Sequence, residues 1–116
     1  MACELPPFAG GGGNNPDPIQ YCLYGLAACF ASTLAATATS EGVALKTLKV
    51  TAMNKVDLRK QLGLSEEPII QNVRLQVKVE SEASGNLIEK IVKLAQKRCP
   101  GIECVTRSIP LRVETE

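Results

Sequence analysis

The stretch that decides the fold is residues 17–42, which read DPIQYCLYGLAACFASTLAATATSEG. It carries no charge between Asp17 and Glu41, and most of its side chains are apolar or small. Asp17 suits the N-cap of a helix, Pro18 suits the first helical position, and Gly42 suits the left-handed turn after a helix end. The sequence therefore predicts one long helix, buried on every side, as the central element of the fold.

The same uncharged run is long enough to cross a lipid bilayer. Its second half, however, consists largely of threonine, serine, alanine and glycine, and no cluster of lysine or arginine flanks either end to set an orientation. These two features favour a core helix over a membrane-spanning helix. We therefore expect no membrane partner.

Length and composition exclude several classes of function. The 116 residues predict a single domain over 1–116, with residues 1–16 as an irregular lead-in rich in glycine and proline. A net charge of +1 and an aromatic content of 3% argue against a nucleic-acid partner. Because the chain has no histidine, we expect no histidine general base, no metal site and no cofactor. The remaining chemistry is that of thiols or carboxylates.

Five cysteines are the candidate chemical groups: Cys3, Cys22, Cys29, Cys99 and Cys104. Their number is odd, their spacings fit no zinc ribbon, and no secretory signal is recognisable ahead of them. Such usage is typical of a cytoplasmic protein whose thiols either fill the core or take part in redox chemistry. We therefore expect a cytoplasmic location.

Three segments alternate between apolar and polar residues with the period of a β-strand. They are residues 45–52, 72–80 and 109–113, and the second has the clearest alternation in the chain. We expect a crossover between the first two strands and a closing strand from the third. A short helical turn over 57–62, closed by Gly63, lies between the first two strands.

A second helix is indicated over residues 84–98, where an apolar stripe faces a charged one. Cys99 continues the apolar stripe, and the Pro-Gly pair that follows is expected to end the helix. The fold class is thus α+β, with a small β-sheet packed against a long buried central helix and a second amphipathic helix. Since the central helix has no polar face, another layer or a second subunit must cover it, and we expect a homodimer.

Three stretches of the chain carry a pattern known from one protein family. They are LPPFAGGGGNNPDPIQYCLYGLAACF at 5–30, with its Ala-Ala-Cys step at Cys29, VDLRKQLGL at 56–64, and Lys-Arg-Cys-Pro at 97–100. Together they resemble the OsmC/Ohr family, the osmotically inducible protein C and organic hydroperoxide resistance proteins. The resemblance runs from about Leu5 to the C-terminus.

The resemblance implies an OsmC-like fold and a peroxiredoxin-like hydroperoxide reductase. In the family, the cysteine at the position of Cys29 attacks the peroxide and becomes a sulfenic acid. The cysteine at the position of Cys99 then condenses with it to a disulfide. The resemblance also implies an intertwined homodimer, an organic hydroperoxide as substrate, and a dithiol reductant such as a lipoyl group or a small thiol.

Two features of the family pattern are not matched. An N-terminal β-rich segment of the family supplies an arginine that activates the thiolate, and no residue here corresponds to it. A glutamate of the hydroperoxide resistance branch is replaced by Ile19. Arg98 and Arg107, on either side of Cys99, are the candidates to take over the activating role. Because a thiol in apolar surroundings is inert without a cation beside it, we expect weak peroxidase activity that rises above pH 7.

Each cysteine also has a plainer interpretation. On pattern alone, Cys29 and Cys99 fit buried thiols that act as small hydrophobes, and only the resemblance favours a redox pair. We expect Cys22 in the core and Cys3 without a role, and Cys104 is kept as an alternative resolving thiol to Cys99. The alternative function is a non-catalytic OsmC-like dimer that binds an apolar ligand in a cysteine-lined cleft.

Overall fold

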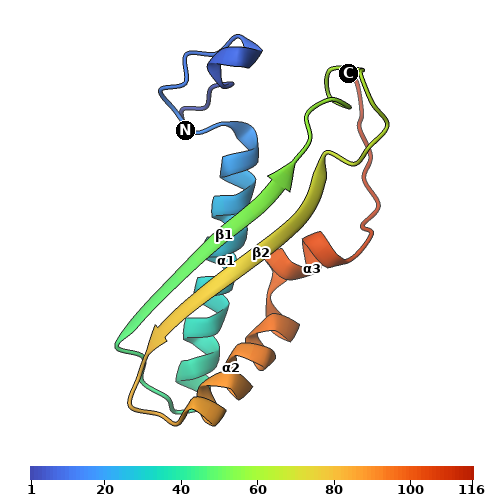
Figure 1. Ribbon diagram of the computed structural model, residues 1–116. Coiled ribbons are helices and arrows are strands. Elements are labelled where there is room, and N and C mark those ends of the chain that lie inside the picture. Colours follow the sequence, from blue (N-terminus) through green and yellow to red (C-terminus); the bar gives the residue numbers. More distant parts are fainter.

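Three helices and one β-hairpin make up the protein, which we describe from a computed structural model of residues 1–116. In chain order the elements are the 3-10 helix η1 (Pro7–Ala9), α1 (Pro18–Ser40), β1 (Thr47–Val56), β2 (Ile70–Glu80), α2 (Gly85–Arg98) and α3 (Pro100–Thr106). The two strands cross α1 obliquely and lie on one side of the helices (Figure 1). This architecture confirms the predicted α+β class.

The sheet is an antiparallel pair of strands. Its ladder runs from Thr47 opposite Glu80 to Val56 opposite Ile70. The expected crossover is therefore wrong, because residues 57–69 connect neighbouring antiparallel strands at one end of the sheet. Alternation of side chains along a strand defines the face that each one takes, but it carries no information on strand direction.

The connection between the strands begins with a hydrogen-bonded turn over 58–63, not a regular helix. Gly63 closes this turn with a φ of 76°, in the left-handed region that favours glycine. The Arg59 side chain pairs with the Asp57 carboxylate at 2.7 Å. Hydrogen bonds from the side chain and the backbone N–H of Arg59 lower the pKa of Asp57 to about 2.

The central helix α1 begins and ends where the sequence predicts. The Asp17 side chain accepts a hydrogen bond from the Gln20 backbone N–H at 2.8 Å, and the Gln20 side chain accepts one from the Asp17 N–H at 2.9 Å. This reciprocal capping box satisfies two backbone donors that the helix itself leaves unpaired. By length and composition alone α1 is long and apolar enough to cross a membrane, but here it forms the centre of a packed core.

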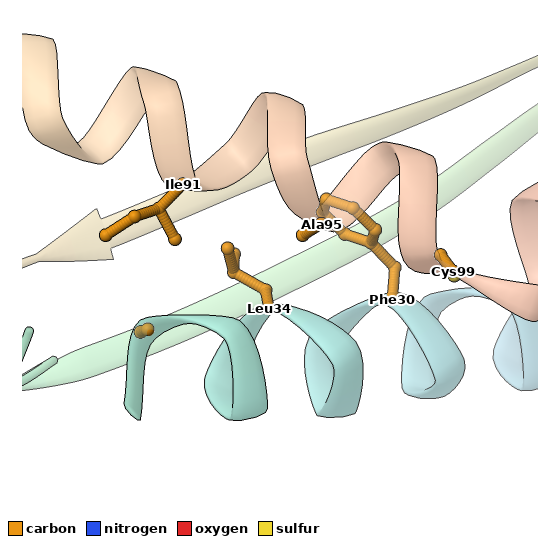
Figure 2. Packing of buried hydrophobic residues seen from close by; sticks show 6 residues of the cluster. Phe30, Leu34, Ile91, Ala95 and Cys99 are labelled. Carbon is orange, nitrogen blue, oxygen red and sulfur yellow. The ribbon is translucent and has the colours of Figure 1, made fainter. Parts of the chain in front are cut away.

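The core cluster lies between α1 and α2, and none of its six residues is more than 2% exposed. Figure 2 shows Phe30 and Leu34 of α1 meeting Ile91 and Ala95 of α2, with Cys99 directly after α2, and Ala38 of α1 completes the cluster. Apolar side chains of the hairpin, including Val50 and Val77, pack against them. The opposite face of α1, with Ser32, Ala35 and Ala36, is exposed. One hairpin and α2 cover only part of the helix, so α1 is not buried on every side within one chain.

The C-terminal part of the chain differs from the prediction twice. Pro100 ends α2 but also opens α3, because its fixed φ and missing N–H suit the first position of a helix. Residues 109–113 form no strand, and Ile109 and Leu111 are 51% and 86% exposed. A strand needs a neighbouring edge for its backbone hydrogen bonds, and this segment finds none within the chain.

In the lead-in, residues 1–16, the only regular element is η1. The Glu4 backbone N–H donates to the Pro16 carbonyl at 3.2 Å, and the Asn14 N–H donates to the Glu4 side chain at 2.8 Å. A Cβ on Gly11 would lie 1.7 Å from a backbone oxygen, so glycine is required there. The lead-in thus folds back on itself beside the N-terminal end of α1.

Candidate active site

Cys29 and Cys99 meet in space although 70 positions separate them in the sequence. Cys29 lies in the middle of α1, and Cys99 lies between α2 and α3 with 2% of its surface exposed. The two Sγ atoms are 3.7 Å apart, with the Cys99 thiol donating to Cys29. Because a disulfide bond is about 2.05 Å long, the sulfurs must approach by about 1.6 Å to form one.

The local structure explains why the two sulfurs converge. Consecutive residues of a helix are rotated by about 100°, so Cys29 points beside the core face on which Phe30 lies, toward the side that α3 contacts. Cys99 has an extended backbone, with φ of −80° and ψ of 116°, which separates α2 from α3. Cys99 packs beside Phe30 at one end of the core (Figure 2).

A backbone group also reaches the Cys29 sulfur. The Gly101 N–H, in the first turn of α3, donates to Cys29 Sγ at 3.3 Å. Cys29 Sγ therefore accepts two hydrogen bonds, one from Gly101 and one from the Cys99 thiol. Hydrogen-bond donors directed at a sulfur favour its anionic form, the form in which cysteine acts as a nucleophile.

Neither arginine predicted to activate the thiolate contacts a sulfur in this chain. The Arg107 guanidinium pairs with the Glu103 carboxylate at 3.6 Å, one turn earlier on α3. Arg98 is exposed at the end of α2 and borders an open hollow beside Ser32 and Ser40 of α1. The activating role of the two arginines stays a prediction, and the donors at Cys29 are those described above.

The other three cysteines are exposed, and each keeps a free thiol. Cys22 lies on α1 two turns before Cys29, so its predicted place in the core is wrong within this chain. The core face of α1 ends near Leu26, and the helix beyond it toward the N-terminus has no α2 beside it. Cys104 lies on the surface of α3, and Cys3 lies in the lead-in.

An open apolar groove of about 400 Å³ lies along the N-terminal half of α1. Its walls come from α1, the end of the hairpin and α3, and they include Ile19, Leu23, Leu26, Ile70, Val73 and Val105. Leu26 lies one turn before Cys29 and also borders Gly101. Leu26 therefore lies between the groove and the surroundings of Cys29, and neither Cys29 nor Cys99 lines the groove itself.

The sequence predicts neither the contact of Gly101 with Cys29 nor the residues that line the groove. The Pro-Gly pair after Cys99 predicts a helix stop, but proline also suits the first position of a new helix, and here it opens α3. No group of three or more His, Cys, Asp or Glu side chains is placed to hold a metal ion. The chemistry that this arrangement offers is thiol chemistry at a partly buried pair of sulfurs.

Comparison with protein families and solved structures places the chain among proteins with the same architecture. The family profile described as OsmC-like protein matches residues 11–114. An organic hydroperoxide resistance protein, OsmC, from Legionella pneumophila has a TM-score of 0.71 and 23% identity, covering 89% of this chain and 71% of that one. An OsmC-like protein from Mycoplasma pneumoniae has a TM-score of 0.67 and 21% identity, with coverages of 79% and 63%.

A third solved structure comes from Vibrio cholerae and is assigned as an organic hydroperoxide resistance protein, with captopril bound in one of its active sites. Its TM-score is 0.66 and its identity 24%, covering 89% of this chain and 67% of that one. This chain thus spans between 63% and 71% of the length of the three proteins. At these identities the likeness shows a common fold. No curated protein sequence matches the chain.

Proposed function

This chain belongs to the OsmC-like protein family, and from that premise we propose that it is a thiol peroxidase that reduces organic hydroperoxides through Cys29 and Cys99. The family and its redox-protein relatives support a general role in hydroperoxide resistance. The observation that carries the finer proposal is the 3.7 Å separation of the two sulfurs. A pair of thiols at that distance is suited to alternate between two thiols and one disulfide.

In the proposed reaction the Cys29 thiolate attacks one oxygen of the hydroperoxide. An S–O bond forms, the O–O bond breaks, and the alkoxide leaves as the alcohol after taking up a proton, so that Cys29 becomes a sulfenic acid. The Cys99 sulfur then attacks Cys29 Sγ, an S–S bond forms, and the sulfenic oxygen leaves as water. A dithiol of the lipoyl type or a small thiol reduces the disulfide by exchange and is itself oxidised.

The surroundings of the two thiols support this assignment of roles. Cys29 is the more exposed of the pair, and its sulfur accepts hydrogen bonds from Gly101 and Cys99. Cys99 is 2% exposed and its thiol donates. A partly exposed sulfur that accepts hydrogen bonds suits the attacking thiolate, whereas a buried thiol suits the resolving partner.

The apolar groove supports an organic hydroperoxide as the substrate. Its lining side chains are mostly aliphatic and include Leu26, one turn before Cys29. The hydrocarbon part of a hydroperoxide placed there would leave water while its –OOH group lies toward Cys29 Sγ. Burial of hydrocarbon contributes about 25 cal/mol for each Å², so a bulky alkyl group has a clear advantage over hydrogen peroxide.

We also propose that the functional unit is a homodimer. The chain exposes 8631 Å² of surface, whereas a compact monomer of its mass, 12.4 kDa, exposes about 6,100 Å². The difference, about 2,500 Å² per chain, is as large as the surface that subunits of obligate dimers bury. The uncharged outer face of α1 and the apolar residues of 109–113 are exposed in the single chain and belong to this excess.

Sedimentation equilibrium at micromolar concentration tests the homodimer. We expect a mass close to twice that of one chain, stable on dilution. A single species at the mass of one chain would contradict it.

The cytoplasm, where thiols are kept reduced, is the compartment that we propose for this chemistry.

Hydroperoxide consumption tests the enzymatic proposal directly. Protein with dihydrolipoamide should consume cumene hydroperoxide in many turnovers. Cys99→Ser should complete only the first step, so that dimedone traps a sulfenic acid on Cys29. Cys104→Ser, which alters an exposed thiol outside the pair, is the control and should turn over like the unmodified protein. No consumption above that of dithiol alone would sink the proposal.

The groove also supports a second candidate function, that of a non-catalytic dimer which binds an apolar ligand. Its open apolar volume of about 400 Å³ is the observation that favours this alternative. Titration with a fatty acid, followed by calorimetry, separates the two functions when combined with the turnover assay. Binding without turnover would favour the alternative, and turnover with competition by the fatty acid would favour the peroxidase.

A further inference from the structure

Gly101 brings its backbone against the Cys29 thiol more closely than any other residue type would allow. A Cβ built on Gly101 would lie 3.1 Å from Cys29 Cβ, 3.2 Å from Leu26 Cδ1 and 3.3 Å from Cys29 Sγ. All three separations are tighter than ordinary van der Waals contact, so any side chain here would push α3 away from α1 by a few tenths of an ångström. The distance from the Gly101 N–H to the sulfur would lengthen by a similar amount.

The conformation of the backbone does not explain the glycine. The glycines with positive φ are Gly10, Gly13, Gly42 and Gly63, and Gly101 is not among them. Gly101 lies in the first turn of α3, where every residue type fits the backbone and glycine is among the poorer helix formers. The absence of a side chain at this position allows α3 to approach α1 closely, and this close approach permits the hydrogen bond from Gly101 to Cys29.

That hydrogen bond is directed at the form of Cys29 that reacts. The neutral sulfur of a thiol is a weak acceptor, whereas a thiolate is a charged and much stronger one. The backbone N–H of Gly101 carries a fixed dipole, and this donor does not depend on pH because the amide does not titrate. Arg107 is paired with Glu103, and Arg98 contacts neither sulfur, so Gly101 and Cys99 supply the two donors at Cys29 within this chain.

We propose that Gly101 is a positioning residue for Cys29: its lack of a side chain allows the backbone N–H to hold Cys29 Sγ and to stabilise the thiolate. The inference rests on the proposed function for its purpose, but its physical content is a contact between one N–H and one sulfur. A hydrogen bond to a charged acceptor is stronger than one to a neutral acceptor, so the loss of this contact should slow the reactions of Cys29 at neutral pH by about tenfold.

Alkylation of Cys29 by iodoacetamide tests this contact without any peroxide. Chymotryptic digestion and mass spectrometry give the rate at Cys29 separately from Cys22, because Tyr24 and Leu26 lie between them. We expect Gly101→Ala, whose Cβ displaces the N–H, to lower the rate at pH 7 by about tenfold. At pH 10, where solvent hydroxide removes thiol protons without help, the rate should change by about twofold or less.

The matched control is Gly85→Ala, in the first turn of α2. A Cβ on Gly85 meets nothing within 4 Å, so this variant makes the same chemical change without a displacement, and its alkylation profile should equal that of the unmodified protein. An equal loss of rate at pH 7 and pH 10 in Gly101→Ala, or no loss at either, would overturn the proposal. Equal losses would indicate a change of access to the thiol instead of a change in its charge.

A second measurement needs no variant at position 101 and covers the case in which Gly101→Ala fails to fold. In nitrogen-15 spectra of the reduced protein, the Gly101 amide proton should move downfield as pH rises and Cys29 ionises. In Cys29→Ser the same resonance should stay in place. A Gly101 resonance that does not respond while Cys29 becomes reactive would overturn the contact. Both outcomes are independent of turnover, so the proposed peroxidase activity and this inference can fail separately.

Discussion

The two halves of α1 carry one cysteine each, in opposite surroundings. Cys29 borders the half that packs against α2, and it touches Cys99 and the N–H of Gly101. Cys22 lies two turns earlier, in the half that lines the open groove, and its thiol is free and exposed. The helix sequence around the two is similarly uncharged. The two thiols therefore differ because the junction of α2 and α3 lies beside Cys29 and not beside Cys22.

The two halves of α1 also contribute differently to the core and to the groove. The C-terminal half holds Phe30, Leu34 and Ala38, all about 1% exposed, and these residues form half of the buried core cluster. The N-terminal half holds Ile19 and Leu23, which are partly exposed and line the groove. One half therefore carries stability, and the other half offers apolar surface to a ligand.

The largest expected effect separates the two thiols. Cys29→Ser should lower hydroperoxide turnover to the background rate, because a serine hydroxyl is not ionised at neutral pH and does not attack peroxide. Cys22→Ser should keep kcat and alter only KM, because its thiol lies in the groove and not at the reacting pair. Steady-state kinetics with cumene hydroperoxide give both values. A Cys22→Ser variant with the lost kcat and an active Cys29→Ser variant would reverse the comparison.

The next effect separates the two halves by stability. Leu34→Ala should lower the free energy of unfolding by about 2–5 kcal/mol, since it empties a site in the core that is 1% exposed. The same substitution at Leu23, which is partly exposed in the groove, should cost clearly less. Urea unfolding at one fixed protein concentration gives both values, because subunit association makes stability depend on concentration. Equal losses of unfolding free energy in the two variants would contradict the claim that the C-terminal half of α1 provides most of its stabilising contacts.

A smaller effect is expected on substrate preference. Val73→Gln places a polar group in the groove at a position already 37% exposed, so the fold should tolerate it. The ratio of kcat/KM for cumene hydroperoxide to that for hydrogen peroxide should fall by about tenfold, since only the organic substrate uses the groove. Arg74→Gln, on the other face of β2, is the control and should leave the ratio unchanged. A ratio that is unaffected by Val73→Gln would place the substrate elsewhere.

The smallest effect concerns the turn over 58–63. The pKa of Asp57, lowered to about 2 by its hydrogen bonds with Arg59, means that the pair stabilises the folded state at every pH above the ordinary range of a carboxyl group. This stabilisation is lost as pH falls toward about 2. The small difference in Tm between the protein and Asp57→Asn should therefore be constant from pH 7 to about pH 5 and shrink progressively below it. A difference that vanishes already at pH 6 would contradict the pairing.

Local patterns were sufficient to predict much of the fold. Asp17 and Pro18 at one end of α1 and Gly42 at the other act on the backbone beside them, so their effect is readable from the sequence alone. The apolar stripe of α2 and the alternation along both strands are local in the same sense. Strand direction was not readable, because alternation looks the same in parallel and antiparallel pairs. The expected strand over 109–113 was wrong because pairing needs an edge elsewhere.

The candidate site depended on contacts that no local pattern encodes. The approach of Cys29 to Cys99 followed from a family resemblance, since a separation of 70 positions holds no information on distance. The contact with Gly101 was missed because α3 was not expected, and the exposure of Cys22 was missed because the missing cover of α1 is a tertiary feature. In each case the deciding neighbour lies on another element.

The central claim is that Cys29 and Cys99 form the redox pair, and oxidation of the reduced protein by one equivalent of cumene hydroperoxide tests it most directly. Remaining thiols are blocked, and the protein is digested with chymotrypsin and with an endoproteinase that cleaves after glutamate. Cleavage after Glu103 separates Cys99 from Cys104. Mass spectrometry should then find a peptide bearing Cys29 joined to a peptide bearing Cys99. Recovery of Cys29 as an unlinked thiol, with Cys99 bridged to Cys104, would contradict the account.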